Sequence, residues 1–376
     1  MSDFPASEYE ARIAAVQRLM AAADLPVVLL ASEAEIRYFT GFRTLFWQSP
    51  TRPWFVILRR DQQPLAIIPE IGAALMQRSG IAEVRTWAAP APDDDGVSLL
   101  HDALKGHDRI GVMMGHETSF RMPLHDLFRL RGMLSADWID ATAMIRSLRM
   151  VKSEAEIALL KNITAIASDA FEALPQQLTK GQALDDVFSA FKRSLLALGA
   201  EDVPYLVGGV GRPSYDDVIS PPTPAPLEEG AVLMLDTGAV LKGYFCDFDR
   251  NFAIGPPSDA VRKGYAALQA ATDAALAIAQ PGVTAKALYQ AMAAAMQIEG
   301  SDVGRFGHGL GMQLTEWPSL AVWDDTVISA NMVITLEPSI AIDGGGIMVT
   351  EENIVIRDDE PEWLSRRAPP EIPVIG

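Results

Sequence analysis

The sequence predicts two domains: an α/β domain over residues 1–148 and an α+β domain with internal pseudo-twofold symmetry over residues 149–376. Three observations lead to this prediction. Short apolar runs alternate with helical patterns through the first domain, as in a small α/β fold. A long amphipathic pattern then begins near residue 153. Two helical segments of equal length follow it, which favours a duplicated unit.

Four short segments of the first domain have the pattern of strands. They are apolar and rich in β-branched residues, and turn or charged residues bound them. They cover residues 25–32, 53–60, 64–70 and 109–115, and helical patterns between them cover residues 6–23, 71–79, 97–105 and 123–131. This alternation predicts a sheet with helices on it.

The second domain begins with a helix-start signal and continues with a repeat. Ser153 followed by Glu156 is a capping-box pattern before a long amphipathic run. Helical segments from Gly181 to Gly199 and from Gly282 to Gly300 span the same interval of 18 residues, and strand-like segments follow each. The match favours duplication, although two unrelated helices that end in glycine can also agree in length.

Composition and charge limit the classes of partner. The 376 residues are 49% hydrophobic and 21% charged, as in a globular protein. The net charge of −18 argues against nucleic acid or an anionic membrane, because both would be repelled. A single cysteine and the lack of a leader pattern or long apolar run lead us to expect a cytoplasmic protein.

Acidic residues occur where apolar strands are expected. Asp236 and Asp247 stand in VLMLDTGAVLKGYFCDFDRNF, Glu337 in NMVITLEPSIAI and Glu351 in GGGIMVTEENIVI, while His308 is flanked by glycines in GHGLGM. Each has an ordinary structural explanation when taken singly. Together they suggest a metal site, because buried carboxylates are costly without a compensating cation, and four of them can hold two hard or borderline ions.

In this order and in these contexts, the five residues resemble the pita-bread metallopeptidase family. That family includes Xaa-Pro dipeptidases, aminopeptidase P, methionine aminopeptidase and the metal-free hydrolase creatinase. The spacings of 11 residues from Asp236 to Asp247, 29 from His308 to Glu337 and 14 from Glu337 to Glu351 fit the prolidase branch. The resemblance implies a creatinase/prolidase-like first domain and a pita-bread (creatinase/aminopeptidase-like) second domain.

The resemblance also implies ligands and chemistry. Asp236 and Asp247 would bind one divalent ion, Asp247, His308 and Glu337 the other, and Glu351 would bridge them. A hydroxide held between the ions would attack a carbonyl while Glu337 handles its proton. We expect two divalent ions, with Mn²⁺ as the first choice and Zn²⁺, Co²⁺ or Fe²⁺ as alternatives.

The chain departs from the family pattern at the positions of two further histidines. The upstream Pro-His segment is replaced by VGGVGRPSYDDVISPPTPAP, which has no histidine, and Thr315 stands seven residues after His308 where the second is expected. Asp249 replaces a usual threonine, and Ser339 a usual glycine. Losing transition-state donors typically lowers the rate by 10²-fold or more, so a proficient peptidase is less certain than its ligands suggest.

Three residues are candidates to replace the missing imidazoles. Tyr215 and Thr315 can form hydrogen bonds with a substrate, and Arg212 can offset negative charge. Tyr215 can equally well pack in a loop against Pro213.

An aromatic and basic segment, YFTGFRTLFWQSPTRPWF, supplies candidates for substrate binding. Arg43, Trp47 and Arg52 can hold a carboxylate beside an apolar or cationic group, whereas simple packing of the domain is the alternative. In the family that this chain resembles, the corresponding loop often reaches the partner's active site. We therefore expect a homodimer.

Three functions remain open at this level. The first is an Xaa-Pro dipeptidase-like metallohydrolase that cleaves a small peptide or amide. The second is a non-peptidase of the same fold that hydrolyses another C–N bond, or eliminates, on a small zwitterionic substrate. The third is a catalytically idle binding protein that keeps its metals for stability. The intact ligands favour the first function, and the missing histidines favour the second.

Overall fold

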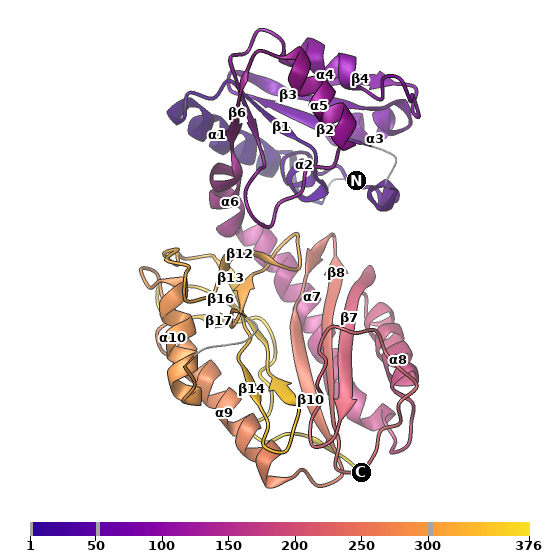
Figure 1. The fold of residues 1–376 in the computed structure, drawn as a ribbon, viewed down its shortest axis with the longest axis vertical. Coiled ribbons are helices and arrows are strands. Elements are labelled where there is room, and N and C mark those ends of the chain that lie inside the picture. Colours follow the sequence, from indigo (N-terminus) through magenta and orange to yellow (C-terminus); the bar gives the residue numbers. More distant parts are fainter. Residues whose placement is uncertain (1–2, 50–52, 300–303) are drawn as a thin grey trace. The chain divides into compact units, whose positions relative to one another are not determined.

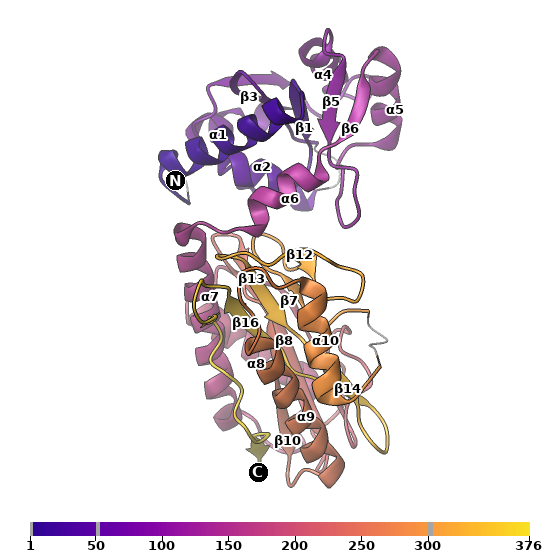
Figure 2. The same cartoon turned by 90° about the vertical axis from the view of Figure 1, so that its left-hand side faces the viewer.

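The computed structural model describes residues 3–49, 53–299 and 304–376. The chain divides into two compact units, Met1–Arg149 and Met150–Gly376. Figures 1 and 2 show a mixed sheet with helices in the first unit, and longer helices flanking strands in the second. Within the described ranges, no helix is both long and apolar enough to cross a membrane.

The first unit contains one six-stranded sheet in the order β4-β3-β2-β1-β5-β6. The strands are β1 (Val27–Leu30), β2 (Phe55–Arg59), β3 (Gln62–Pro69), β4 (Glu83–Trp87), β5 (Arg109–Val112) and β6 (Asp137–Asp140). The α-helices are α1 (Ala6–Ala22), α2 (Glu33–Thr40), α3 (Ala73–Arg78), α4 (Val97–Leu104), α5 (Leu124–Met133) and α6 (Thr142–Met150), with short 3₁₀ turns at Leu45–Gln48 and Glu70–Gly72.

The four predicted strands and four predicted helices of this unit correspond to β1, β2, β3 and β5 and to α1, α3, α4 and α5. The sequence prediction missed β4 and β6, which lie at the two edges of the sheet. Their residues are half-buried or exposed, so they carry none of the apolar run that identifies a buried strand. Helices α2 and α6 were also missed.

The second unit holds two five-stranded sheets. One has the order β18-β10-β8-β7 with β9 beside β8, and the other has the order β12-β11-β13-β16-β17. Its helices are α7 (Glu154–Ala173), α8 (Leu184–Ala197), α9 (Asp259–Leu276) and α10 (Ala285–Met296), with a 3₁₀ turn at Leu174–Gln177. Its strands are β7 (Asp202–Gly211), β8 (Val232–Leu241), β9 (Tyr244–Phe245), β10 (Phe248–Ile254), β11 (His308–Gly309), β12 (Glu316–Ser319), β13 (Val333–Leu336), β14 (Ser339–Ala341), β15 (Ile347–Val349), β16 (Glu352–Val355), β17 (Glu362–Trp363) and β18 (Val374–Ile375).

The capping box predicted at the start of this unit is present. The Ser153 hydroxyl accepts a hydrogen bond from the Glu156 amide at 3.2 Å, and the Glu156 carboxylate accepts one from the Ser153 amide at 2.9 Å. Both amides would otherwise lack partners, because the first turn of a helix has no preceding carbonyls to receive them. Helix α7 therefore begins at Glu154.

Matching contacts in the two halves confirm the predicted duplication. Ala183 forms an isolated bridge with Pro226, and Thr284 forms one with Val327, so each residue lies 101 positions after its counterpart. Hydrogen bonds repeat with the same offset: the amide of residue 184 donates to the carbonyl of residue 225, and that of residue 285 to that of residue 326, both at 2.9 Å. Gly300, the predicted end of the second helical segment, lies outside the described residues.

Strand pairing extends the duplication to the sheets. Val232 pairs with Ala253 across β8 and β10, and Val333 pairs with Val355 across β13 and β16. Positions in β8 therefore reappear 101 residues later, and positions in β10 reappear 102 residues later. By this register Arg250 corresponds to Glu352, and residue 251 to residue 353.

The alternation of side chains decides where acidic residues can lie. Leu233 and Leu235 of β8 pack with helices α7 and α8, whereas Val232 and Met234 lie on the opposite face of the strand. Asp236 continues the second series. The helices seen on the outside of the sheets in Figure 1 thus cover the faces that do not carry the acidic residues.

Two glycines allow strands to approach closely beside the acidic positions. Gly208 of β7 has φ +147°, and a Cβ built on it would lie 2.1 Å from the Met234 carbonyl oxygen. In the other half, Gly307 has φ +130°, and a Cβ would lie 2.2 Å from the Thr335 carbonyl oxygen. Backbone atoms cannot move aside easily, so both positions require glycine.

We predict that Gly208→Ala lowers the melting temperature more than Gly181→Ala does, in scanning calorimetry of the full chain. Gly181 also has positive φ, +84°, but nothing lies within 4 Å of its added Cβ. That control carries only the backbone cost of about 1–2 kcal/mol, whereas Gly208→Ala adds a clash with a carbonyl. Equal shifts for the two variants would contradict the close approach of β7 and β8.

Candidate metal centre

The acidic residues singled out in the sequence occupy matching places on the two sheets of the second unit. Asp236 lies in β8, and Asp247 immediately precedes β10. Glu337 follows β13, and Glu351 immediately precedes β16. Asp247 and Glu351 are buried, and the other two are half-buried. Strand register thus brings four carboxylates, two from each half, to the same level of the unit.

His308 adds a nitrogen to this group. Its Nδ1 lies 2.9 Å from the Gly309 carbonyl oxygen, which can only accept, so Nδ1 carries the proton. Burial lowers the pKa of His308 to about 4, and the positive charge of Arg305 adds to this effect. The ring is therefore neutral, and its unprotonated Nε2 lies 3.4 Å from Oδ2 of Asp247. Two acceptors that face each other leave room for a cation between them.

Three buried side chains have the spacing of metal ligands. One potential ligand atom each from Asp247, His308 and Glu351 lies within 4.8 Å of the other two. An ion about 2.0–2.3 Å from each atom fits this spacing. One nitrogen among carboxylate oxygens suits borderline and hard divalent cations.

Burial without compensation perturbs all four carboxylates. It raises the pKa of Asp236 to about 7, with a further contribution from the charge of Glu337. It also raises the pKa of Glu337 to about 7, against the opposing effect of Arg305. Asp247 and Glu351 have pKa values raised well above the usual range, first by burial and then by neighbouring acids. Cations would reverse this penalty.

Unsatisfied oxygen atoms indicate where such cations fit. Asp236 Oδ1 and Glu351 Oε1 are buried and have no hydrogen-bond partner among the described residues. Buried acceptors in proteins are normally paired, so orphaned carboxylate oxygens point to a missing positive group. The donor set and these orphaned atoms together fit divalent metal ions.

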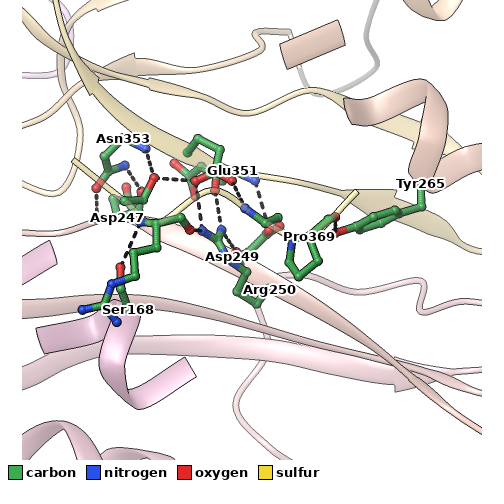
Figure 3. A network of polar contacts seen from close by, with 12 residues as sticks. Ser168, Asp247, Asp249, Arg250, Tyr265, Glu351, Asn353 and Pro369 are labelled. Atoms are coloured by element: carbon green, nitrogen blue, oxygen red, sulfur yellow. Dashed lines mark hydrogen bonds and ion pairs between the residues drawn. The ribbon is translucent and has the colours of Figure 1, made fainter. Parts of the chain in front are cut away.

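Asn353 holds the main chain of one of these acids. Its Oδ1 accepts a hydrogen bond from the Asp247 amide at 3.1 Å, and its Nδ2 donates to the Asp247 carbonyl. Figure 3 shows Asp247, Glu351 and Asn353 side by side. The side chain of one half thereby fixes a carboxylate of the other half.

Arg250 secures the same region. Its guanidinium donates to the carbonyl of Glu351 at 3.0 Å and to the carboxylate of Glu352 at 2.9 Å. Glu352 is therefore engaged in an ion pair with Arg250. Its neighbour Glu351 is the glutamate that lies with Asp247 and His308. Glu351 is also the residue that the sequence analysis selected.

Sequence reasoning missed two side chains at this site. Tyr205 of β7 pairs with Gly238, two residues after Asp236, and burial together with the charges of the four acids raises the pKa of Tyr205. Arg305 carries the positive charge that acts on Glu337 and His308. The only signal in the sequence was position: Tyr205 precedes the glycine-rich end of a strand, and Arg305 stands three residues before His308.

Thr315 lies in the loop before β12, and this loop reaches the sheet that contains β7, β8 and β10. A Cβ built on Gly238, two residues after Asp236, would lie 2.3 Å from the side chain of Leu314, the neighbour of Thr315. The next residue, Glu316, is buried and forms an ion pair with buried Lys152 at 3.2 Å. This pair holds the loop in place beside the strand that carries Asp236.

Tyr215 is a core residue, so its predicted role as a donor to the substrate is not supported. Its side chain is 1% exposed. Its hydroxyl donates to Asn251 Oδ1 at 2.9 Å and accepts from the Val349 amide at 2.8 Å, which uses both hydrogen-bonding functions. The amide of Asn251 in turn donates to the Val349 carbonyl at 2.6 Å. The packing alternative describes Tyr215 better.

Arg212 is not brought to the metal centre. It is exposed and follows the end of β7, five residues beyond Val207, the strand partner of Asp236. Five residues of strand span about 16 Å. Its guanidinium lies beside Gly230, two residues before β8 begins.

The predicted substrate-binding residues of the aromatic segment belong to the first unit. Trp47 is buried and packs against Trp54, with ring centroids 6.2 Å apart, as the packing alternative expects. Arg43 is partly exposed and pairs with Asp3 at 3.7 Å. Arg52 lies outside the described residues. A role for these residues in a partner's active site stays a prediction.

Comparison with known proteins agrees with this geometry. The dipeptidase PepE of Mycobacterium tuberculosis, described as probable, is 27% identical over 360 residues that cover 95% of this chain and 94% of that protein. The Xaa-Pro dipeptidase of Pyrococcus furiosus is 23% identical and covers 90% and 93% of the two chains.

Solved structures show the same fold. The crystal structure of dipeptidase PepE from Mycobacterium ulcerans superposes with a TM-score of 0.86 at 26% identity, over 99% of each chain. The prolidase of Pyrococcus horikoshii gives a TM-score of 0.82 at 23% identity, over 95% of this chain and 98% of that one. These similarities confirm the predicted pita-bread fold. Because residues 12–151 match the creatinase/prolidase N-terminal domain and residues 158–358 match metallopeptidase family M24, the chain belongs to that metallopeptidase family.

Proposed function

We propose that this protein is a metal-dependent dipeptidase that hydrolyses short peptides, with Xaa-Pro dipeptides as the first substrates to test. The observation that carries the proposal is the close approach of His308 Nε2, the ring nitrogen left free by the Nδ1 hydrogen bond, to the buried carboxyl groups of Asp247 and Glu351. Membership of a metallopeptidase family and relatives named as dipeptidases support the same reaction.

The proposed centre holds two divalent ions, with Mn²⁺ as the first choice. Asp236, Asp247, His308, Glu337 and Glu351 would hold them. Bound divalent ions lower the pKa of water and polarise a carbonyl, which is the chemistry that peptide hydrolysis needs.

Glu337 is the proposed proton carrier. Its carboxylate is half-buried among the other acids of the centre, where it could accept a proton from water and return it to the leaving group. Arg305 supplies positive charge beside it and offsets negative charge that develops on a substrate carbonyl oxygen.

Tyr205 is the proposed replacement for one missing imidazole. Its half-buried side chain stands opposite Gly238, on the face of the sheet that carries Asp236, and its phenol keeps its proton, since burial and four acidic neighbours hold its pKa high. A protonated phenol at this place can donate to the substrate. Thr315 remains a second proposed donor, because its loop lies over the strand that carries Asp236.

A non-peptidase reaction on the same centre is the second candidate. His308 is the only histidine of residues 150–376, so no further imidazole of this unit can serve a peptide substrate. A phenol and a guanidinium beside two ions would equally suit a small zwitterionic substrate with a carboxylate. The assay below separates the two reactions.

We also propose a homodimer in the cytoplasm, with Arg43 and Arg52 directed to the partner's substrate; both features stay predictions.

The first prediction concerns metal and activity. After removal of metals by a chelator and reloading with Mn²⁺, the wild type should bind two ions and cleave Xaa-Pro dipeptides in a dipeptide panel assay. His308→Ala should lose bound metal and at least about 100-fold of the activity, because a ligand is removed. His125→Ala, at an exposed residue of α5, is the control and should change neither the bound metal nor the activity. Two bound ions without turnover of any dipeptide would favour the non-peptidase reaction.

The second prediction concerns pH. Asp236 and Glu337 have ordinary pKa values near 4 when unfolded and about 7 in the metal-free fold, so folding takes up protons between these values. The melting temperature of the chelated protein should therefore fall as the pH rises from about 4 to 7. Excess Mn²⁺ should reverse the slope, because deprotonated acids bind the ions. Parallel slopes with chelator and with Mn²⁺ would argue against these ligands.

The third prediction separates the two tyrosines. Tyr205→Phe should lower kcat by about 10²-fold and leave the number of bound ions unchanged, because it removes a donor that contacts the site. Tyr215→Phe should lower the melting temperature and keep kcat within about threefold, because its hydroxyl joins core strands. Steady-state kinetics and metal analysis measure both, and the reverse result would exchange the two roles.

A further inference from the structure

Asp249 is a buried acid with one unused oxygen. Its side chain is 2% exposed, and its Oδ1 accepts a hydrogen bond from the amide of Glu351 at 3.0 Å. Its Oδ2 is buried without a hydrogen-bond partner in the part of the chain that the structure describes. Figure 3 shows Asp249 beside Glu351, at the edge of the acidic group.

Strand register places Asp249 on the same face as two proposed ligands. It pairs directly with Asp236 across β8 and β10, and directly opposed residues project to the same side of a sheet with Cβ atoms about 4.5–5.5 Å apart. It also stands two residues after Asp247, which gives the same side by alternation. Three carboxylates of the first half therefore face one region.

The internal duplication gives Asp249 a counterpart. Residues of β10 reappear 102 positions later in β16, so Asp249 corresponds to Glu351, just as Asp236 corresponds to Glu337 at an offset of 101. The first half thus repeats the acidic pair of the second half at the same register. In the family that this chain resembles, a threonine is usual here, so the repeat is a property of this chain.

A purely structural role does not require a carboxylate at this position. The hydrogen bond from the Glu351 amide needs only an acceptor, which a threonine hydroxyl or an asparagine oxygen supplies equally well. A charge buried beside Asp236 and Asp247 costs free energy unless cations balance it. The nearby Arg250 guanidinium is occupied by main-chain carbonyls and by Glu352.

We infer that Asp249 is a fifth acidic residue of the metal centre. It acts as a positioning residue that fixes Glu351 through Oδ1, while the negative charge on Oδ2 strengthens the binding of divalent cations without coordinating them. The inference rests on the proposed metal centre. It explains why a buried, partly unpaired acid is kept in a chain that already has four carboxylates for two ions.

The test compares Asp249→Asn and Asp249→Thr with the wild type in the full chain. Both variants keep an acceptor for the Glu351 amide and remove the charge. Titration calorimetry with Mn²⁺ should show affinity weaker by at least about tenfold, the usual range for groups that support metal ligands. Without metal, both variants should melt at a higher temperature than the wild type, because burying an acid with one unpartnered oxygen, whether ionised or protonated, costs free energy that asparagine or threonine does not.

Glu156→Gln is the matched control. Glu156 is 3% exposed, and its oxygens accept hydrogen bonds from Tyr244 at 2.8 Å and from the Ser153 amide at 2.9 Å. It should lower the melting temperature equally with and without Mn²⁺, and leave the Mn²⁺ affinity unchanged.

The other possible outcomes distinguish a failure of the inference from a failure of the proposed metal centre or reaction. If Asp249→Asn binds Mn²⁺ within twofold of the wild type, or melts lower without metal as the control does, Asp249 is structural and the inference is wrong. If the wild type binds no Mn²⁺, the inference and the proposed metal centre are both wrong. If the wild type binds Mn²⁺ without cleaving dipeptides, only the proposed reaction is wrong, and the comparison of affinities still tests Asp249.

Discussion

Two asparagines hold the strands of the acidic site together, and the rest of the second unit depends on this contact. The side chain of Asn353 forms hydrogen bonds with the amide and the carbonyl of Asp247, and the side chain of Asn251 donates one to the carbonyl of Val349. The offset of 102 relates Asn251 to Asn353 and also residue 247 to residue 349, so the two contacts are reciprocal. Each half fixes the strand of the other half at the point where carboxylates must converge.

The convergence has a free-energy cost that the fold alone does not offset. Five acidic side chains lie beside one another with few donors, and three of them have an oxygen without a hydrogen-bond partner in the described chain. Water would normally solvate such groups, but packing of the strands buries Asp247, Asp249 and Glu351. Cations restore the balance, so the same burial that destabilises the metal-free protein gives the site its affinity for metal.

The sequence was informative where a residue contradicted its context. An acid inside an apolar strand is conspicuous, so Asp236, Asp247, Glu337 and Glu351 could be selected, and the capping box located the start of α7. Edge strands β4 and β6 gave no such contrast, because half-exposed strands carry mixed residues. The positions of side chains relative to the site depend on register and tertiary packing, which short-range patterns do not encode.

Tyr205 and Tyr215 illustrate this limit. Both are tyrosines of the same region, and the sequence made Tyr215 a candidate donor, with packing in a loop as an equal alternative. Register puts Tyr205 opposite Gly238, two residues from Asp236, whereas Tyr215 turns into the core to join Asn251 and Val349. The pairing of β7 with β8 therefore decided which phenol faces the site, and only the fold contains that information.

The ion pair between Arg250 and Glu352 joins equivalent positions of the two halves. The two residues meet at 2.9 Å. If both halves carried the same residue there, two arginines or two glutamates would face each other and repel. The contact therefore requires the two halves to differ in sequence, and neither half can be replaced by a copy of the other without bringing like charges together.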